Sequence, residues 1–165
     1  MKRALVRHAD PYRDTQLIDE RARRVNQTVV GVVAAVAVVT GWWPLLALLA
    51  LQLALGLTLG RRWCLPCLFY FEVLQPRFGE GTLEDSRPPR FANMVGLGFL
   101  AAASLAYLAG WTTLGAVLGG LVAVLALLAA TTGFCAGCTA YRIGYLLTGR
   151  KFVSCPLPPP LPSER

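Results

Sequence analysis

The sequence has little charge, and long stretches of it have none. No Asp, Glu, Lys, Arg or His occurs from Val25 to Gly60 or from Phe91 to Tyr141. These stretches of 36 and 51 residues each exceed the roughly 20 residues that one membrane span needs. Only 15% of the chain is charged, against about 25% in a typical soluble domain. The remaining residues are too few to cover such stretches with a polar shell, which excludes a soluble globular fold.

A pair of residues, Gly then Trp, divides each uncharged stretch near its middle, at Gly41-Trp42 and Gly110-Trp111. Gly favours a turn, and Trp favours the membrane–water interface. We therefore expect two spans in each stretch. The four predicted transmembrane helices are residues 25–41, 43–60, 92–110 and 112–133.

Positive charge is absent from the two Gly-Trp turns. Of the 16 Lys and Arg residues, seven precede the first span, five lie between the second and third spans, and four follow the fourth. Because Lys and Arg near span ends mark the cytoplasmic side, we expect both termini and the central loop to be cytoplasmic, in a bacterial inner membrane. The first 24 residues have no cleavable signal pattern, so the first span is expected to remain as an anchor. This charge favours contact with anionic lipid headgroups, not with nucleic acid.

What the sequence does contain is a repeated cysteine motif of the form aromatic-Cys-x-x-Cys-x-x-Tyr. The first copy runs from Trp63 through Cys64 and Cys67 to Tyr70, and the second from Phe134 through Cys135 and Cys138 to Tyr141. Both cysteines and the tyrosine are offset by 71 residues between the copies. The surroundings repeat as well, since Asn26 near the start of the first hairpin corresponds to Asn93 near the start of the second.

The predicted fold is an all-α membrane protein with four transmembrane helices. They form two helical-hairpin repeats of parallel orientation, because each repeat has an even number of spans. Each repeat ends in a Cys-x-x-Cys segment at the cytoplasmic interface, one span length from its Trp turn. The predicted parts are a cytoplasmic N-terminal segment (1–24), repeat one (25–74), a cytoplasmic loop (75–91), repeat two (92–149) and a Pro-rich cytoplasmic tail (150–165).

Positively charged side chains accompany both cysteine pairs. Residues i and i+3 share a face of a helix, so each pair and its tyrosine, Tyr70 or Tyr141, should form one stripe. A short helix is expected to begin near Cys64, and a thiol at a helix N-terminus beside cations has a lowered pKa. We expect Arg61 and Arg62 to act in this way on the first pair, and Arg142 on the second.

Three interpretations of the four thiols remain open. Reversible dithiol–disulfide chemistry or sulfur relay suits Cys-x-x-Cys pairs. Two such pairs are also the usual ligand set of a tetrahedral Cys₄ site for zinc or iron, if Cys64, Cys67, Cys135 and Cys138 converge. Finally, free cysteine is a common small buried residue. No His lies nearby in sequence and Glu72 is the only close acid, which disfavours metal.

The chain resembles a bacterial integral-membrane family, domain of unknown function 4395. The resemblance covers about Ile18 to Tyr145, and its most specific part is the second cysteine motif. The other matching residues are Ile18-Asp19-Glu20-Arg21, Arg24-Val25-Asn26-Gln27, Pro76-Arg77-Phe78-Gly79, Glu84-Asp85, Pro89-Arg90-Phe91-Ala92 and Val95-Gly96. Members usually carry an acid directly after the second cysteine, where this chain has Thr139, and the pair Cys64 and Cys67 is not expected throughout the family. The resemblance implies thioredoxin-like or rhodanese-like sulfurtransferase neighbours.

We therefore expect thiol redox or sulfur-relay work with a soluble partner, in which Cys64 and Cys135 attack and Cys67 and Cys138 resolve. Because the cytoplasm keeps thiols reduced, any disulfide there should be transient or catalytic. A structural or metal-bound scaffold is one alternative. A small transporter of a sulfur compound is another, with Gln52, Ser104, Thr131 and Thr132 as its available polar residues. Small residues in the spans suit either a compact bundle or a homo-oligomer. Cys155, in the tail, is expected to be an exposed reduced thiol.

Overall fold

The protein is almost entirely helical, as predicted. The computed structural model describes residues 10–147, so Cys155 and the Pro-rich tail lie outside the described residues. In chain order the elements are β1 (Leu17–Asp19), α1 (Glu20–Thr40), α2 (Pro44–Thr58), α3 (Leu65–Phe69), α4 (Gln75–Phe78), β2 (Leu83–Asp85), α5 (Arg87–Leu108), α6 (Thr112–Thr132) and α7 (Ala136–Leu147). A single 3-10 turn at Arg61–Trp63 precedes α3, and a π-helical turn at Tyr70–Leu74 joins α3 to α4.

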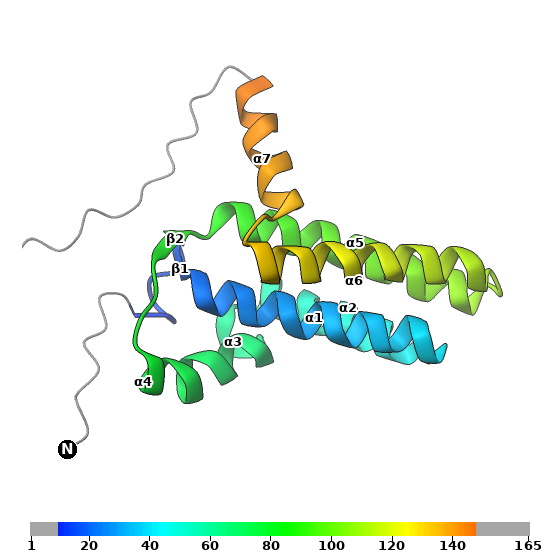
Figure 1. Ribbon diagram of the computed structural model, residues 1–165, viewed down its shortest axis with the longest axis horizontal. Coiled ribbons are helices and arrows are strands. Elements are labelled where there is room, and N and C mark those ends of the chain that lie inside the picture. Colours follow the sequence, from blue (N-terminus) through cyan, green and yellow to red (C-terminus); the bar gives the residue numbers. More distant parts are fainter. Residues whose placement is uncertain (1–9, 148–165) are drawn as a thin grey trace, which may run out of the picture.

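Four helices, α1, α2, α5 and α6, lie along one long axis and form the body of the molecule (Figure 1). The main packing partners are α1 with α6 and α2 with α5. Small residues allow close approach, since a Cβ built on Gly31 would lie 2.7 Å from Leu127 Cγ. The buried core consists of apolar side chains: Val30, Ala34, Ala37, Leu46, Leu49, Ala50, Leu53, Leu100, Ala103, Val122 and Ala123.

Three of these helices, α1, α5 and α6, are long and apolar enough to cross a membrane, with 21, 22 and 21 residues. The fourth, α2, is apolar but has 15 residues. At about 1.5 Å per residue it is roughly 22 Å long, which is shorter than the roughly 30 Å hydrocarbon core. It is shorter than the predicted span 43–60 because Pro44 sets its start and Gly60, at φ +90°, follows its end.

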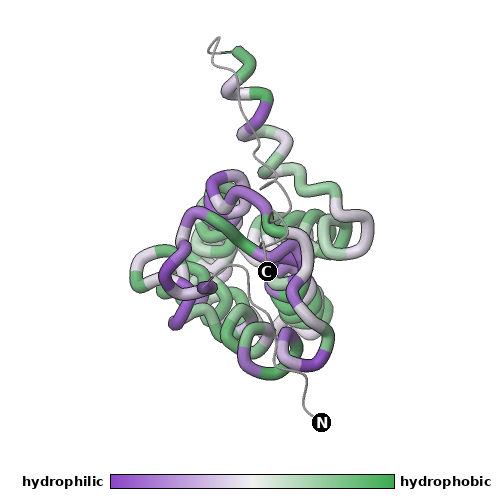
Figure 2. Tube along the Cα trace, turned by 90° about the vertical axis from the view of Figure 1, so that its left-hand side faces the viewer, coloured by the Kyte–Doolittle hydropathy of each residue, from purple (hydrophilic) through white to green (hydrophobic). Residues whose placement is uncertain are grey.

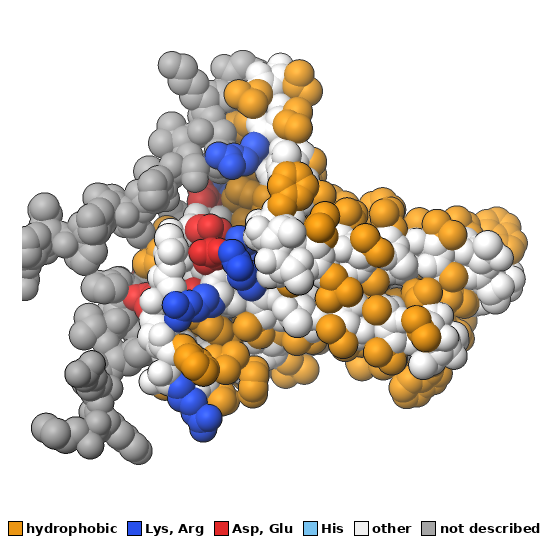
Figure 3. All heavy atoms as spheres, in the orientation of Figure 1, with side chains coloured by type: hydrophobic (Ala, Val, Ile, Leu, Met, Phe, Trp, Pro, Cys, Tyr) orange, Lys and Arg blue, Asp and Glu red, His pale blue; other side chains and the backbone are white. Residues whose placement is uncertain are grey.

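The two ends of the bundle differ in polarity. The connections from α1 to α2 and from α5 to α6 lie at one end, and β1, β2, α3, α4 and the start of α7 gather at the other (Figure 1). Charged side chains cluster at this second end, whereas apolar side chains cover the helices beyond it (Figure 3). Viewed along the bundle from this end, hydrophilic segments lie in front of the hydrophobic helices (Figure 2). We call it the charged end.

A short pair of strands at the charged end was not predicted. β1 and β2 are antiparallel, with Ile18 opposite Glu84. Two further backbone bonds extend the pairing, from Glu20 N–H to Thr82 O (2.9 Å) and from Ser86 N–H to Gln16 O (2.8 Å). The pairing fixes the segment before α1 against the segment before α5. The region predicted as a loop, 75–91, thus contains α4, β2 and the first turn of α5, and α1 begins five residues before the predicted span.

Candidate functional site

The first cysteine of each motif stands directly before a helix. Cys64 is extended, with φ −86° and ψ 96°, and its carbonyl accepts the N–H of Leu68 (2.8 Å) in the first turn of α3. The carbonyl of Cys135 accepts the N–H of Thr139 (2.9 Å) in the first turn of α7. This is the geometry of an N-cap residue. The expected helix start near Cys64 is therefore confirmed, and the second motif has the same local arrangement.

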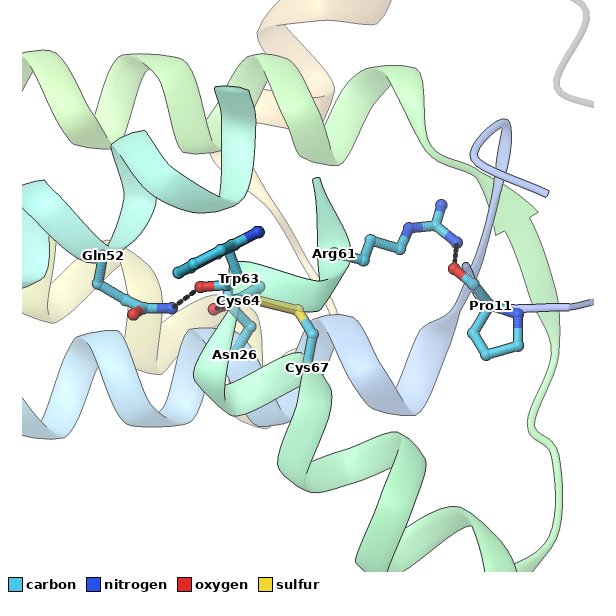
Figure 4. The surroundings of a disulfide bond; sticks show 7 residues. All are labelled: Pro11, Asn26, Gln52, Arg61, Trp63, Cys64 and Cys67. Atoms are coloured by element: carbon cyan, nitrogen blue, oxygen red, sulfur yellow. Dashed lines mark hydrogen bonds between the residues drawn. A yellow bond between two sulfur atoms is a disulfide. The ribbon is translucent and has the colours of Figure 1, made fainter. Parts of the chain in front are cut away.

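The first pair is oxidised and buried. Cys64 and Cys67 form a disulfide, with their Cα atoms 5.2 Å apart. They pack with Ala22, Tyr70 and Phe71 in a small apolar cluster beneath the charged end. Asn26 of α1 lies beside this disulfide, with its Oδ1 atom 3.7 Å from Cys64 Sγ (Figure 4).

The two arginines that precede the first pair contact the N-terminal segment. Arg61 donates from Nη1 to the carbonyl of Pro11 (3.0 Å) and from Nη2 to that of Thr15 (3.0 Å). Its side chain extends away from the disulfide toward Pro11 (Figure 4). Arg62 stacks over the ring of Tyr12, 5.3 Å from its centroid. Both side chains therefore hold residues 10–15 against the charged end, and their influence on the thiols stays a prediction.

Asp19 links the first motif to the rest of the charged end. One carboxylate oxygen caps α1 by accepting the N–H of Arg21 (2.8 Å). The other accepts the hydroxyl of Tyr70 (2.7 Å) and the N–H of Gly81 (2.9 Å). Burial, followed by the bond to Asp19, raises the pKa of Tyr70 well above its usual value. Tyr70 is thus a structural tie between the first motif and α1.

The second pair consists of free thiols, with Cys135 buried and Cys138 partly exposed. The backbone N–H of Cys138 donates to Cys135 Sγ (3.3 Å). The hydrogen bond from the Cys138 side chain is the largest cause that lowers the pKa of Cys135 to about 6, with further contributions from the backbone of Cys138 and the charge of Arg23. The same thiol–thiol bond raises the pKa of Cys138. The two shifts therefore favour a thiolate on Cys135 and a proton on Cys138.

Arg23 is a residue of this site that the sequence did not reveal. Its side chain comes from α1, is almost fully buried, and lies 3.4 Å from Glu84 Oε2 through its Nε atom. It lines a polar cavity of about 260 Å³ at the charged end, together with Cys135, Cys138 and the predicted residue Arg142. The cation among the causes that lower the pKa of Cys135 is thus Arg23. Arg142, which was predicted for this role, lines the same cavity, and its influence on the thiols stays a prediction.

The tyrosine of the second motif does not repeat the role of the first. The ring of Tyr141 lies 5.5 Å from that of Phe91 and 5.1 Å from that of Tyr145. It is partly exposed on α7, whereas Tyr70 is buried. The predicted cysteine–cysteine–tyrosine stripe is therefore buried throughout only in the first motif.

The geometry bears on the two alternatives from the sequence. Within residues 10–147, no three His, Cys, Asp or Glu side chains lie together in a way that could hold a metal ion. The four cysteines thus do not meet the convergence that a Cys₄ zinc or iron site requires. Of the residues suggested for transport, Ser104 donates to Leu100 O (2.8 Å), and Gln52 donates to Trp63 O (3.3 Å; Figure 4). The hydroxyls of Thr131 and Thr132 likewise donate hydrogen bonds to backbone carbonyls of their own helix.

Comparison with known proteins gives a family but no function. Residues 18–145 match the family described as Domain of unknown function (DUF4395). No curated protein and no solved structure matches the chain. Because the match covers most of the sequence, the chain belongs to the DUF4395 family.

Proposed function

We propose that this protein is a membrane dithiol centre in which Cys135 is the attacking thiol and Cys138 the resolving thiol. The observation that carries the proposal is the environment of Cys135. Its sulfur accepts the Cys138 N–H at the start of α7, lies beside buried Arg23, and borders the polar cavity. Because its pKa is lowered to about 6, Cys135 is mostly thiolate at neutral pH, and the thiolate is the nucleophile in disulfide exchange.

The proposed chemistry is thiol–disulfide exchange with a soluble protein. The Cys135 thiolate attacks one sulfur of a partner disulfide, a mixed disulfide forms, and the other partner sulfur leaves as a thiolate. Cys138 then loses its proton and attacks Cys135 Sγ, which releases the second partner sulfur and leaves a Cys135–Cys138 disulfide. The partner we propose is a thioredoxin-like protein, and a rhodanese-like sulfurtransferase that exchanges a sulfane sulfur with Cys135 is its counterpart for sulfur relay.

The first pair is proposed as a second dithiol of the same centre. The structure holds it as a disulfide, while the second pair is reduced. In the reduced form, the Cys64 thiol would be placed to donate to Asn26 Oδ1, which lies 3.7 Å from its sulfur. Each motif would then exchange two electrons, with one pair oxidised while the other is reduced.

We also propose the finer topology expected from the sequence: four spans, two hairpin repeats of parallel orientation, and both cysteine pairs at the cytoplasmic face of a bacterial inner membrane. Two observations support it. The first helix of each hairpin packs on the second helix of the other, which is the pattern that a two-fold repeat axis produces. The charged side chains gather at the end that holds both motifs, as expected of a cytoplasmic face.

The first test is the redox state of the five cysteines in growing cells. Thiols are trapped with acid, alkylated, and mapped by peptide mass, so that each cysteine is scored as free, disulfide-bonded or carrying added sulfur. A Cys135–Cys138 disulfide or a persulfide on Cys135 in part of the population supports the proposal. Free Cys135 and Cys138 under oxidant stress and sulfur feeding alike would overturn it.

The second test traps the partner. Cys138→Ser leaves a mixed disulfide on Cys135 unresolved, so a covalent complex with a thioredoxin-like or rhodanese-like protein should accumulate. The double variant Cys135→Ser, Cys138→Ser is the matched control, since it should insert into the membrane equally well and trap nothing. Equal capture by both variants would show that Cys135 is not the attacking thiol.

A further inference from the structure

A second cavity reaches the Cys135 motif from inside the helix bundle. It measures about 120 Å³ and is lined by residues of α1, α2, α5 and α6 within the apolar part of the body. Its walls are apolar side chains and small residues, among them Val30, Leu53, Gly96 and Phe99. An apolar cavity of roughly 150 Å³ in a protein core is large enough to bind benzene. At about 120 Å³ this cavity is somewhat smaller than that benchmark, so it has room for one planar ring at most.

The end of the cavity nearest the charged end is polar. There it is lined by Asn26, Gln27, Asn93 and Cys135. Among the described residues, Gln27 Oε1 is buried and accepts no hydrogen bond. A buried acceptor without a donor is costly, so this atom indicates a ligand with a hydroxyl group. The amide N–H groups beside it are donors that suit a carbonyl.

We propose that this cavity binds the ring of a lipid-soluble quinone, which exchanges two electrons with the Cys135–Cys138 pair. The proposal rests on the proposed function, since it needs a redox-active dithiol. The apolar walls suit the ring, and the residues at the polar end suit one of its two carbonyls or hydroxyls. Three of the lining helices are long enough to cross a membrane, which suits a ligand dissolved in lipid.

The reaction balances with the groups present. Cys135 as thiolate and Cys138 as thiol give up two electrons and one proton, and the Cys135–Cys138 sulfur–sulfur bond forms. The quinone takes up the two electrons, that proton and one proton from water, and both of its carbonyls become hydroxyls. In the reverse direction a quinol reduces the disulfide. The hydroxyl of the quinol is the donor that Gln27 Oε1 lacks.

The same amides lie next to the first pair. Asn93 and Leu53 also line a cavity of about 110 Å³ that includes Cys64 and Cys67. Asn26 faces Cys64 Sγ at 3.7 Å and lines the quinone cavity as well. The ring would thus bind between the two dithiols, with an asparagine of each repeat beside it.

The test uses the full-length protein in nanodiscs, reduced and freed of reductant, with ubiquinone-1 as the probe. Absorbance of the quinone reports its reduction, and alkylation reports the thiols. We expect one ubiquinone-1 reduced for each Cys135–Cys138 pair oxidised. Reaction of the same preparation with a soluble aromatic disulfide reports the dithiol independently of any quinone.

Two glycines of α5 provide matched variants. Gly96 lines the cavity, and a Cβ there meets only Leu53 Cδ1 at 3.7 Å, whereas a Cβ on Gly98 meets nothing within 4 Å. Gly96→Leu should fill the cavity and raise the ubiquinone-1 concentration for half-maximal rate at least ten-fold, while Gly98→Leu leaves it unchanged. Gln27→Leu, which keeps the packing volume, should raise the ubiquinone-1 concentration for half-maximal rate several-fold.

The outcomes separate the two proposals. The quinone site is overturned if the protein reacts with the disulfide but does not reduce the quinone. It is also overturned if Gly96→Leu and Gln27→Leu reduce the quinone as fast as the unsubstituted protein does. Either result leaves the dithiol centre standing. Failure of Cys135 to react with either probe overturns both. Loss of quinone reduction in the cavity variants, with disulfide reactivity retained, supports the site.

Discussion

The two cysteine motifs share a pattern and a local geometry but differ in their surroundings. In each, the first cysteine occupies the N-cap position of a helix. The first motif is buried, its cysteines form a disulfide, and the hydrogen bond from Tyr70 to Asp19 joins it to α1. The second is reduced and borders a polar cavity lined by Arg23. The motif thus sets the position of the sulfur, and residues distant in sequence set its surroundings.

The helices that follow the two motifs differ as well. α3 has five residues and continues through a π-helical turn into α4, packed under the bundle. α7 has 12 residues and projects across the bundle axis (Figures 1 and 2). Its exposed apolar residues are Ile143, Leu146 and Leu147. The difference begins inside the motifs, where Leu65-Pro66 stands in the first copy and Ala136-Gly137 in the second.

The largest expected effect is a difference in alkylation rate between the two thiols of the second motif. At pH 6 about half of Cys135 is thiolate, and an unperturbed thiol of pKa about 8.5 is less than about 1% thiolate. After allowance for the weaker nucleophilicity of a low-pKa thiolate, Cys135 should react about ten-fold faster than such a thiol, and faster still than Cys138. Site-resolved mass spectrometry after iodoacetamide treatment at pH 5 to 9 measures this.

The rate for Cys135 should rise with pH and reach half its plateau near pH 6, because the thiolate replaces the thiol as the pH passes the pKa. Cys138→Ala removes the side-chain donor that contributes most to this low pKa. Its half-point should therefore move to higher pH. A half-point that stays near pH 6 in Cys138→Ala would show that the backbone N–H groups and Arg23 are enough to lower the pKa of Cys135.

Next in size is the effect of adding a methyl group inside the second motif. A Cβ on Gly137 would lie 2.6 Å from Ala92 Cβ and 2.8 Å from Ala92 Cα. Gly137→Ala should therefore displace α7 from α5 and destabilise the fold by about 1–3 kcal/mol, as overpacking does. Gly144→Ala in the same helix is the control, since a Cβ there meets nothing within 4 Å. Thermal unfolding in detergent compares them, and equal midpoints would contradict the packing of α7.

The two tyrosines should respond differently to loss of their hydroxyl groups. Tyr70→Phe leaves the buried Asp19 carboxylate one donor short, which should lower the free energy of unfolding by about 1–3 kcal/mol. Tyr141→Phe, in the equivalent sequence position, should cost less than about 0.5 kcal/mol, because the residue is partly exposed. Thermal unfolding midpoints decide this, and similar losses in both variants would restore the symmetry that the sequence suggests.

The smallest expected effect concerns the cation beside Cys135. Arg23→Gln removes a positive charge that lowers the pKa of Cys135, so its alkylation rate at pH 6 should fall about two- to three-fold. Arg142→Gln should change this rate less, since Arg142 lines the cavity but is not among the causes of the shift. A larger fall in alkylation rate in Arg142→Gln would show that Arg142, the residue predicted from the sequence, lowers the pKa of Cys135 more than Arg23 does.

The helical body could be predicted because its signals are local. Long uncharged stretches and Gly-Trp turns suffice to predict the hairpins, and the position of Pro66 in a first turn predicts a helix after Cys64. Even the short length of α2 follows from local residues, since Pro44 begins it and Gly60 lies just beyond its end.

The parts that could not be predicted depend on contacts between distant residues. β1 and β2 are three residues each and pair across the whole first hairpin, so no alternating pattern marks them. Arg23 lies in α1 and meets Cys135 only because α1 packs on α6. Its neighbour in the sequence, Arg24, pairs with Glu20 (2.6 Å). Nothing in the sequence distinguishes these two arginines.

The crossed packing of α1 on α6 and α2 on α5 has a consequence during synthesis. A ribosome adds about 5–20 residues per second, so α6 is complete roughly 5–20 seconds after α1. Until then, α1 lacks its packing partner α6. Gly31, which packs against Leu127 in the folded protein, is exposed to lipid or to other proteins during that interval. Assembly of the Cys135 site therefore requires both hairpins, since Arg23 lies in α1 and Cys135 follows α6.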